Sequence, residues 1–286
     1  RFRYLFNRLC AAVERIMDEV SEELKSSDFE PLAFELAFGA DGQLPAITVR
    51  EENGTARVVG KVDRVDGWLH DGKLYLRVVD YKTGKKSFDL AELRYGLGLQ
   101  MLLYLFTLKE EGRALFGGHE IVPAGVLYTP AREPMLRCAR DTEPEKIEKA
   151  LKKELRRSGM VLEDPAVLQA MEHSALESPC YLPIAVKKDG AVTGSLASAE
   201  QLGKLSKYVD HILHEITREV FAGNIDADPY ARTPQQSACT YCEFASACHF
   251  ENGCGSDRME YIKATKNDEF WQYIDEVNGE GACKNG

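Results

Sequence analysis

The order of patterns along the chain predicts an α/β sandwich built around a small mixed sheet. Three patterns lead to this: an amphipathic helix pattern over residues 2–25, a hairpin signal within residues 56–82, and an apolar helix pattern at 90–110 followed by a strand pattern at 122–128. Strands flanked by helices in this order bury one sheet between helical layers. At 286 residues and 44% hydrophobic content, the chain is long enough for a large core.

The N-terminal part provides the first helix and the first strand. Residues 2–25 carry apolar side chains at helical spacing, with acids and bases between them. Residues 32–38 follow as a strand with Glu35 on its polar face, and residues 39–55 indicate a loop that contains Gly and Pro. Glu35 is a candidate acid for a metal or phosphate site, and the simpler interpretation is a solvent-exposed glutamate.

A β-hairpin with its tip at Asp71 and Gly72 is the strongest local signal in the chain. Asp-Gly between apolar and aromatic residues favours a two-residue turn. With these two residues as the loop, counting back along both strands places Asp63 directly opposite Asp80.

The alternation of side chains puts Asp63, Asp80 and Lys82 on one face of this hairpin. Two opposed carboxylates repel one another, and a divalent metal between them offsets that repulsion. Mg²⁺ commonly binds one or two carboxylates together with water and phosphate oxygens. An Asp followed by Asp-x-Lys therefore predicts phosphodiester hydrolysis, in which the metal activates water and Lys82 positions or assists it.

A simpler interpretation gives the same residues no catalytic role. Asp-Tyr-Lys is a common tripeptide, and Asp63 could pair with a nearby arginine. Asp66 and Arg77, which are opposed on the other face in this register, could form a surface ion pair. The hairpin alone leaves both interpretations open.

The helix predicted at residues 90–110 adds two polar candidates. Gln100 and Tyr104 stand four residues apart and therefore share one face of an otherwise apolar helix. A buried glutamine needs a hydrogen-bond partner. Gln100 could orient Lys82 or the attacking water, and Tyr104 could bind a phosphate; alternatively, both only border the core.

Beyond Pro130 the sequence changes character. The patterns predict, in order, helices at 143–159 and 165–174, a small hairpin at 182–191 and a long helix at 198–222. Ser198 with Gln201 fits a capping box at the start of the long helix. We expect three parts: a core at 1–130, a mainly helical accessory or inserted region at 131–230, and a Cys-rich tail at 231–286.

Three closely spaced cysteines, Cys239, Cys242 and Cys248, predict a metal centre in the tail. Zinc and an iron–sulfur cluster both accept four thiolates, so the spacing does not separate them, and three unligated thiols are the alternative. A fourth thiolate does not follow at the same spacing. The candidates for it are Cys254, Cys10, Cys138, Cys180 and Cys283.

Charge and composition limit the functions. The net charge of −10 argues against nucleic acid as a ligand, but residues 57–109 hold ten Lys/Arg and six Asp/Glu, a local excess of +4. No run of about 18 apolar residues and no signal-peptide pattern occurs, so we expect a cytoplasmic protein without membrane contact. No P-loop or helicase motif occurs, so any ATP use must come from elsewhere. Because the chain begins at Arg1, we expect a fragment or a processed product.

Four ordered motifs together resemble a known nuclease family. They are Gly60–Asp66, Val79–Gly84, Gly98–Tyr104 and the three tail cysteines, with further likeness at Phe34–Gly39 and Tyr95–Leu97. This set resembles the RecB-like branch of the PD-(D/E)XK nucleases, whose core is like that of restriction endonucleases. Within that branch the chain looks most like the C-terminal nuclease domain of AddB subunits, over nearly its whole length.

The resemblance implies a Mg²⁺-dependent exodeoxyribonuclease. Such a domain cuts single-stranded DNA ends that an ATP-dependent helicase–nuclease, with its AddA-type subunit, produces at double-strand breaks for homologous recombination. It implies that Asp63 and Asp80 bind Mg²⁺ with the Tyr81 carbonyl, and that Lys82 is catalytic. It also implies that Gln100 and Tyr104 support the site, and that a [4Fe–4S] cluster is held by Cys239, Cys242 and Cys248.

One departure from the family keeps alternatives open. The family takes its fourth cluster cysteine, and often a motif histidine, from sequence upstream of this domain, and neither is evident here. The cluster is therefore expected in the full-length protein and could be absent from this chain. The competing hypotheses are a non-catalytic DNA-binding or scaffold module that retains the nuclease fold, and a regulatory domain stapled by zinc.

Overall fold

The computed structural model describes residues 2–134, 136–139 and 141–284, with side chains through residue 279. The chain forms two compact units. The first comprises Arg1–Ile47, Val58–Phe88 and Gln100–Ser206, and the second comprises Thr48–Arg57, Asp89–Leu99 and Lys207–Gly286.

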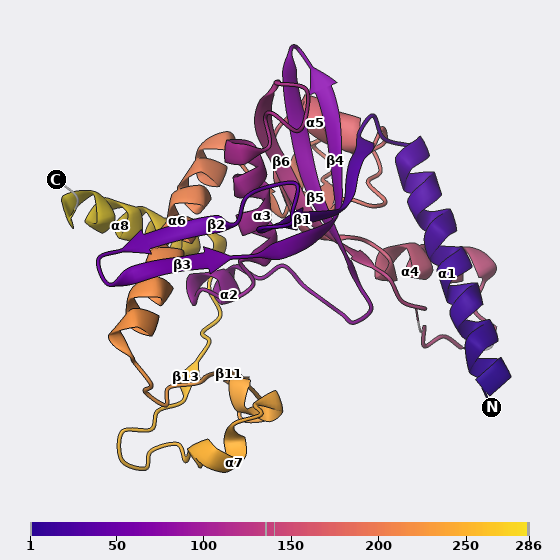
Figure 1. The fold of residues 1–286 in the computed structure, drawn as a ribbon. Coiled ribbons are helices and arrows are strands. Elements are labelled where there is room, and N and C mark those ends of the chain that lie inside the picture. The colour runs from indigo at the N-terminus through magenta and orange to yellow at the C-terminus, as the bar shows by residue number, and fades with distance from the viewer. Residues whose placement is uncertain (1, 135, 140, 285–286) are drawn as a thin grey trace. The chain divides into compact units, whose positions relative to one another are not determined.

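A six-stranded mixed sheet organises the first unit (Figure 1). Its strands, in spatial order, are β1 (Glu30–Phe38), β4 (Gly60–His70), β5 (Lys73–Lys82), β6 (Glu120–Pro130), β7 (Ser158–Leu162) and β10 (Leu196–Ala197). Neighbours are antiparallel except for β5 with β6 and β7 with β10, which are parallel. The predicted α/β fold with a central mixed sheet is therefore confirmed.

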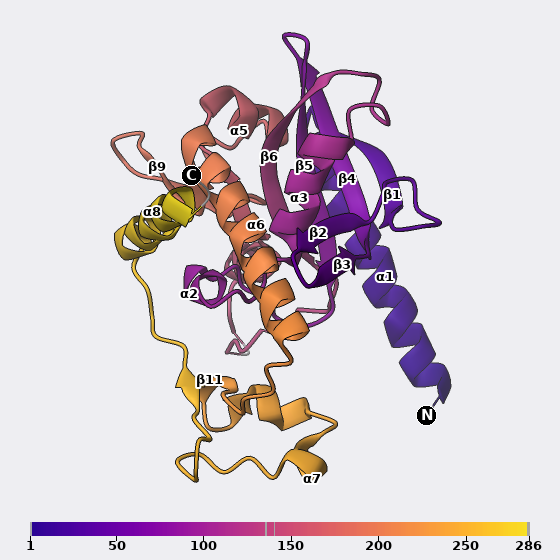
Figure 2. The same cartoon turned by 60° about the vertical axis from the view of Figure 1, so that its left-hand side comes forward.

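Helices pack on this sheet. Helix α3 (Gln100–Glu111) lies along β5 and β6 in both views (Figure 1, Figure 2) and buries most of its apolar side chains. The other helices of this unit are α1 (Phe2–Lys25), α4 (Pro144–Glu154) and α5 (Pro165–Met171), and a small hairpin pairs β8 (Ile184–Val186) with β9 (Val192–Gly194). The buried residues of β5 and β6 include Leu74, Leu76, Val78, Val79, Ile121, Val126 and Leu127, as expected for strands that are covered on both faces.

The second unit is built from short elements and two helices. Its strands form the hairpin of β2 (Ile47–Glu51) and β3 (Gly54–Val58) and a sheet of β11 (Tyr230–Thr233), β12 (Gln236–Ser237) and β13 (Glu260–Tyr261). Its long helices are most of α6 (Ala199–Ala222) and α8 (Asn267–Lys284). Its short helical elements are α2 (Leu90–Arg94), the 3-10 turn η1 (Ala238–Tyr241) and α7 (Ala245–Cys248). Inside this unit, the buried Tyr208 hydroxyl of α6 donates to the carbonyls of Leu93 and Arg94.

Two local predictions are wrong. The segment at 39–55, which was predicted as a loop, contains β2. This strand was not expected because its alternation is short and its side chains are partly exposed. The helix predicted at 90–110 is two helices, α2 and α3, separated at Tyr95–Leu99. Gly96 and Gly98 each have φ of +71°, a left-handed conformation that glycine adopts without strain and that ends α2.

The region beyond residue 130 contributes to the same sheet. Strand β7 pairs with β6, and β10 pairs with β7, although both strands follow the segment expected to form the core. The capping box of α6 is confirmed, since Ser198 and Gln201 exchange side-chain and backbone hydrogen bonds of 2.9 and 3.1 Å. The division of the chain into parts at residues 130 and 230 stays a prediction.

A cluster of five charged side chains, buried on one side of the hairpin, joins several elements. Asp66 lies opposite Arg77 and accepts its Nε–H at 2.8 Å, and it also pairs with Arg64 at 2.8 Å. Glu23 of α1 pairs with Arg157 at 2.6 Å and lies 3.7 Å from Arg77. The register of Asp66 and Arg77 is as expected, but a surface ion pair is wrong, because both side chains are 0% exposed.

The pKa of Glu23 depends on two opposing effects in this ion cluster, burial and the nearby guanidinium groups. Burial by itself raises the pKa, and the guanidinium groups of Arg157, Arg77 and Arg64 outweigh it and hold the pKa of Glu23 below its usual range. The ionised carboxylate is therefore the form that the folded chain stabilises.

We expect Asp66→Asn to destabilise the chain by about 3–5 kcal/mol, because it leaves Arg64 and Arg77 buried with an incomplete set of charges. Urea unfolding followed by circular dichroism measures this change. The control is Glu22→Gln, which removes the exposed pair with Lys25 and should cost under about 1 kcal/mol. Equal effects of the two substitutions would contradict the structural importance of the cluster.

The Glu23 carboxylate should also make stability depend on pH. Its folded pKa lies below the unfolded value of about 4.3, so its contribution is complete above that value and is lost as pH falls through the folded pKa. We expect Glu23→Gln to be much less stable than the parent chain at pH 7, with a difference that shrinks below about pH 4. Urea midpoints measured from pH 7 to pH 3 test this; a constant difference would refute it.

Candidate nuclease site

The hairpin of β4 and β5 positions the candidate catalytic residues. Asp71 and Gly72 both have positive φ, 49° and 77°, as a two-residue hairpin turn requires. The strands pair in the predicted register from His70 opposite Lys73 through to Arg64 opposite Val79. Continuing this register by one step would place Asp63 opposite Asp80, and Asp63 is close enough to raise the pKa of Asp80.

Asp63 is fixed by the backbone of the neighbouring strand. Its Oδ2 atom accepts the backbone N–H of Tyr81 at 2.9 Å. The carboxylate therefore spans from β4 to β5 and lies next to the Asp80–Lys82 segment. Among the described residues, this backbone hydrogen bond, and not an ion pair with a nearby arginine, holds the Asp63 carboxylate in place.

Asp80 is almost buried, with a side chain 12% exposed, and its Oδ2 lies 2.7 Å from Nζ of Lys82. Burial raises the pKa of Asp80 most, Lys82 lowers it, and Asp63 raises it further, so that the pKa lies above its ordinary value. A site with two neighbouring carboxylates, one of them desolvated, fits a divalent cation, because the cation would offset both effects.

Tyr81 connects this site to the ion cluster. Its hydroxyl accepts a hydrogen bond from Nη1 of Arg64 at 2.6 Å, and the Arg64 guanidinium lies 5.6 Å from the centre of its ring. The Tyr81 side chain thus points to the cluster, while its backbone N–H holds Asp63. Metal binding by its carbonyl stays a prediction.

Gln100 and Tyr104 interact with each other at the start of β4. Nε2 of Gln100 donates to the Tyr104 hydroxyl at 3.0 Å, and the Tyr104 ring stacks on Phe38 at 5.3 Å. A Cβ atom at Gly60 would lie 2.2 Å from that hydroxyl, so only glycine permits this packing. Gln100 thus orients the tyrosine, and among the described residues it makes no hydrogen bond with Lys82.

Glu35 follows the simpler of its two interpretations. It forms an ion pair with Lys61, and both side chains are more than half exposed. Its φ of 51° is unusual for glutamate within a strand and turns the side chain locally.

His211 and His214, which stand three apart on α6, do not form a metal site with each other. His214 instead contacts Glu51 at 2.7 Å.

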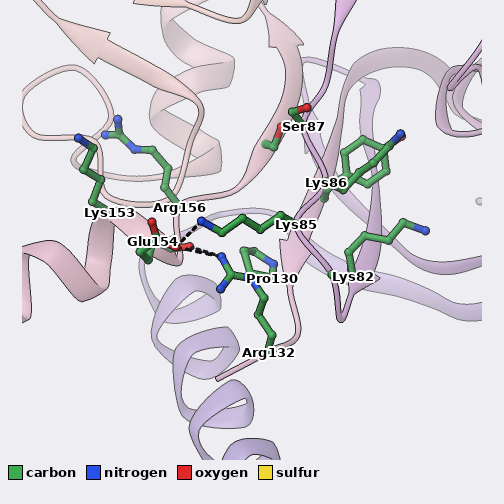
Figure 3. A pocket seen from close by; sticks show the side chains of 12 residues that line it. Lys82, Lys85, Lys86, Ser87, Pro130, Arg132, Lys153, Glu154 and Arg156 are labelled. Atoms are coloured by element: carbon green, nitrogen blue, oxygen red, sulfur yellow. Dashed lines mark hydrogen bonds and ion pairs between the residues drawn. The ribbon is translucent and has the colours of Figure 1, made fainter. Parts of the chain in front are cut away.

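A basic pocket of about 390 Å³ begins at Lys82 (Figure 3). Besides Lys82, its charged lining residues are Lys85, Lys86, Arg132, Lys153, Arg156 and one acid, Glu154. Lys85 and Lys86 belong to the basic stretch at 57–109 that the sequence already shows, whereas Arg132, Lys153 and Arg156 were not expected at the site. The signal for Lys153 and Arg156 is the Lys-Lys-Glu-Leu-Arg-Arg run at 152–157, which also fits an ordinary charged helix end, and Arg132 lies outside that run.

The tail cysteines lie on successive turns of one segment. The backbone N–H of Cys242 bonds to the carbonyl of Cys239, and Cys248 ends the four-residue helix α7. The neighbouring Tyr241 and Phe244 are 93% and 74% exposed, so this stretch has little apolar burial to hold it.

Among the described residues, the tail cysteines are not gathered into one ligand set. Within this described part of the chain, no group of three or more His, Cys, Asp or Glu side chains forms a metal-binding cluster. Free and largely exposed thiols with few apolar contacts nevertheless suit a segment that a metal centre stabilises. The cluster and its ligands therefore stay a prediction, and the side chain of Cys283 lies outside the described residues.

None of the described helices combines the length and apolar character that crossing a membrane requires.

Comparison with known proteins agrees with the geometry. Residues 1–249 match the PD-(D/E)XK nuclease superfamily. Subunits B of ATP-dependent helicase/deoxyribonucleases are 32% identical in Ruminiclostridium cellulolyticum, over 97% of this chain, and 34% identical in Acetivibrio thermocellus and Clostridium botulinum, over 96%. The chain covers 24% of the length of each of these relatives. The resemblance to AddB nuclease domains is confirmed, and the chain belongs to the PD-(D/E)XK nuclease superfamily.

Proposed function

We propose that this chain is a metal-dependent deoxyribonuclease domain that cleaves single-stranded DNA. The observation that carries the proposal is the arrangement of Asp63, Asp80 and Lys82 at the edge of a basic pocket. Two carboxylates supply the negative charge that binds a metal, and the cations beside them suit a polyanionic strand. The names of the relatives add that such domains occur in helicase/deoxyribonucleases.

Asp63 and Asp80, with the Tyr81 carbonyl, would hold Mg²⁺. The ion would lower the pKa of water and neutralise charge that develops on the phosphate. Tyr81 keeps Asp63 in position through its N–H, so the acids need little rearrangement when the ion binds. Lys82, which is ion-paired with Asp80 when no metal is present, would turn to the phosphate or to the attacking water.

Gln100 and Tyr104 would act by positioning. Their mutual hydrogen bond and the stacking of Tyr104 on Phe38 fix the tyrosine against the start of β4, three residues before Asp63. This packing limits the movement of the strand that carries the first carboxylate. The pair therefore supports the geometry of the site without contacting the Asp80–Lys82 ion pair.

In the longer protein, the domain would act with an AddA-type helicase subunit. The partner would supply unwound ends, and cleavage of those ends would serve double-strand-break processing for homologous recombination. The relatives are named as helicase/deoxyribonuclease subunits and are about four times as long as this chain, which supports such a division of labour.

One observation favours a non-catalytic DNA-binding or scaffold module as the second candidate. Lys82 is already paired with Asp80, and within the described residues no third His, Cys, Asp or Glu side chain joins the two acids. A module of this kind would bind DNA through the basic pocket and leave it uncut.

We expect Asp63→Asn, Asp80→Asn and Lys82→Gln each to lower the cleavage rate on single-stranded DNA by about a hundredfold or more with Mg²⁺ present. End-labelled oligonucleotides measure the rate. The matched control is Asp71→Asn at the exposed hairpin tip, which removes one carboxylate from the same hairpin and should cut normally. DNA binding without cleavage by the parent chain in Mg²⁺ would favour the scaffold instead.

We further propose that Cys239, Cys242 and Cys248 bind a [4Fe–4S] cluster. Anaerobically purified protein should contain iron and acid-labile sulfide, and Cys248→Ala should lose both, because the cluster needs thiolate ligands. Ser246→Ala in the same helix, α7, is the control. Zinc in place of iron would support the zinc-stapled alternative, and the absence of both metals would contradict a metal centre in this chain.

A further inference from the structure

The basic pocket extends the site well beyond the residues that would perform the chemistry. Three segments build it: the exit loop after β5, the end of β6 and the end of α4 (Figure 3). Lys82 borders it, so the pocket is continuous with the Asp80–Lys82 pair. We propose that this pocket binds a second phosphate group of the cleaved strand, at or near its end, and so sets the position of the scissile phosphate. This inference rests on the proposed nuclease function.

The charges in the pocket favour a phosphate. Five cations other than Lys82 line a space of about 390 Å³ that contains a single acid, Glu154. Arginine and lysine together suit phosphate oxygens, which accept several hydrogen bonds at once. Two serines add neutral donors. Ser158 accepts the backbone N–H of Phe88 at 2.8 Å, which leaves its hydroxyl hydrogen to donate.

Glu154 organises two of the cations. Its Oε2 atom lies 3.1 Å from Nη2 of Arg132 and 3.3 Å from Nζ of Lys85, and these two partners lower the pKa of Glu154. Figure 3 shows both side chains converging on it. Glu154 thereby holds Lys85 and Arg132 in place, and it accepts only some of the hydrogen bonds that their N–H groups can donate.

Arg132 retains an unused donor. Its Nε atom is buried and has no hydrogen-bond partner among the described residues. A guanidinium has five N–H donors in a fixed plane, and the bonds from Nη2 to the carboxylate and the backbone carbonyl of Glu154 leave other donors to bind an oxyanion. A phosphate oxygen in the pocket would provide the partner that this buried N–H lacks.

The walls of the pocket are fixed by backbone contacts. The Phe88–Ser158 bond ties the exit loop to the start of β7. Arg156 donates to the carbonyl of Pro179, which anchors the side chain at the rim. A preformed pocket of this kind loses little conformational entropy when a strand binds.

The test removes two exposed cations, so that the fold is not at risk. The variant is Lys85→Gln with Lys153→Gln. Its matched control is Lys146→Gln with Lys188→Gln, in which one lysine likewise has an exposed glutamate partner and both lie outside the pocket. The first readout is binding of fluorescent single-stranded DNA to the 286-residue chain in EDTA, at a series of salt concentrations.

We expect the pocket variant to bind about fivefold more weakly near 0.1 M salt, with the slope of log affinity against log salt shallower by about 0.7, because the pocket holds one phosphate. Each lost phosphate contact on a single strand contributes about 0.7 to that slope. The control should keep the parent affinity and slope. Equal behaviour of variant and control would overturn the proposal, whether or not the chain cleaves DNA.

The second readout is cleavage with Mg²⁺ on oligonucleotides that carry a 5′-phosphate, a 5′-hydroxyl or a 3′-phosphate, and on circular DNA. A positioning role predicts a higher KM with nearly unchanged kcat. A loss confined to one phosphorylated end assigns the pocket to a terminal phosphate, and an equal loss on circles assigns it to an internal phosphodiester. If the parent chain cuts none of these substrates, the nuclease proposal fails, while the binding experiment still decides the phosphate site.

Discussion

The buried ion cluster on one side of the hairpin is the constraint on which the first unit depends. Removing charges from water costs several kcal/mol per ion, and the cost is recovered only when every partner is in place. Glu23 comes from α1, Asp66 and Arg64 from β4, Arg77 from β5, and Arg157 from the start of β7. A one-residue slip of the hairpin would separate Asp66 from Arg77 and send both side chains to the wrong face. The cluster thus selects one register and one position for α1.

The same constraint reaches the candidate site through Tyr81. The tyrosine side chain bonds Arg64 on one side of the sheet, and its peptide N–H bonds Asp63. Asp63 and Asp80 can therefore remain close despite their repulsion, because their strands are locked from the opposite face. Burial raises the pKa of Asp80 most, and the neighbouring Asp63 raises it further. Strain of this kind is common where a fold prepares a site for a ligand, and here a cation would relieve it.

The sequence was sufficient for the hairpin and insufficient for the pocket, for physical reasons. Asp71-Gly72 has few turn conformations to choose from, so it determines the register and the positions of Asp63 and Asp80. Burial of Asp66 and Arg77 was not predictable, because the ion cluster that encloses them includes Glu23, which lies beside Arg77, and Arg157, which pairs with Glu23, and both are distant in sequence. The pocket likewise joins an exit loop to the end of α4 through tertiary contacts. The local periodicity of a sequence carries no information about tertiary contacts between segments that are distant in the chain.

Net charge is a poor guide to the proposed ligand for a related reason. Electrostatic attraction between exposed groups is largely screened beyond about 8 Å at physiological salt. A phosphate in the pocket therefore responds to six nearby cations and Glu154, and only weakly to the total of −10. The acidic remainder still has a role at longer range, because it offers DNA no attractive alternative surface. Under the proposed nuclease function, the cations around Lys82 would direct a strand toward Asp63 and Asp80.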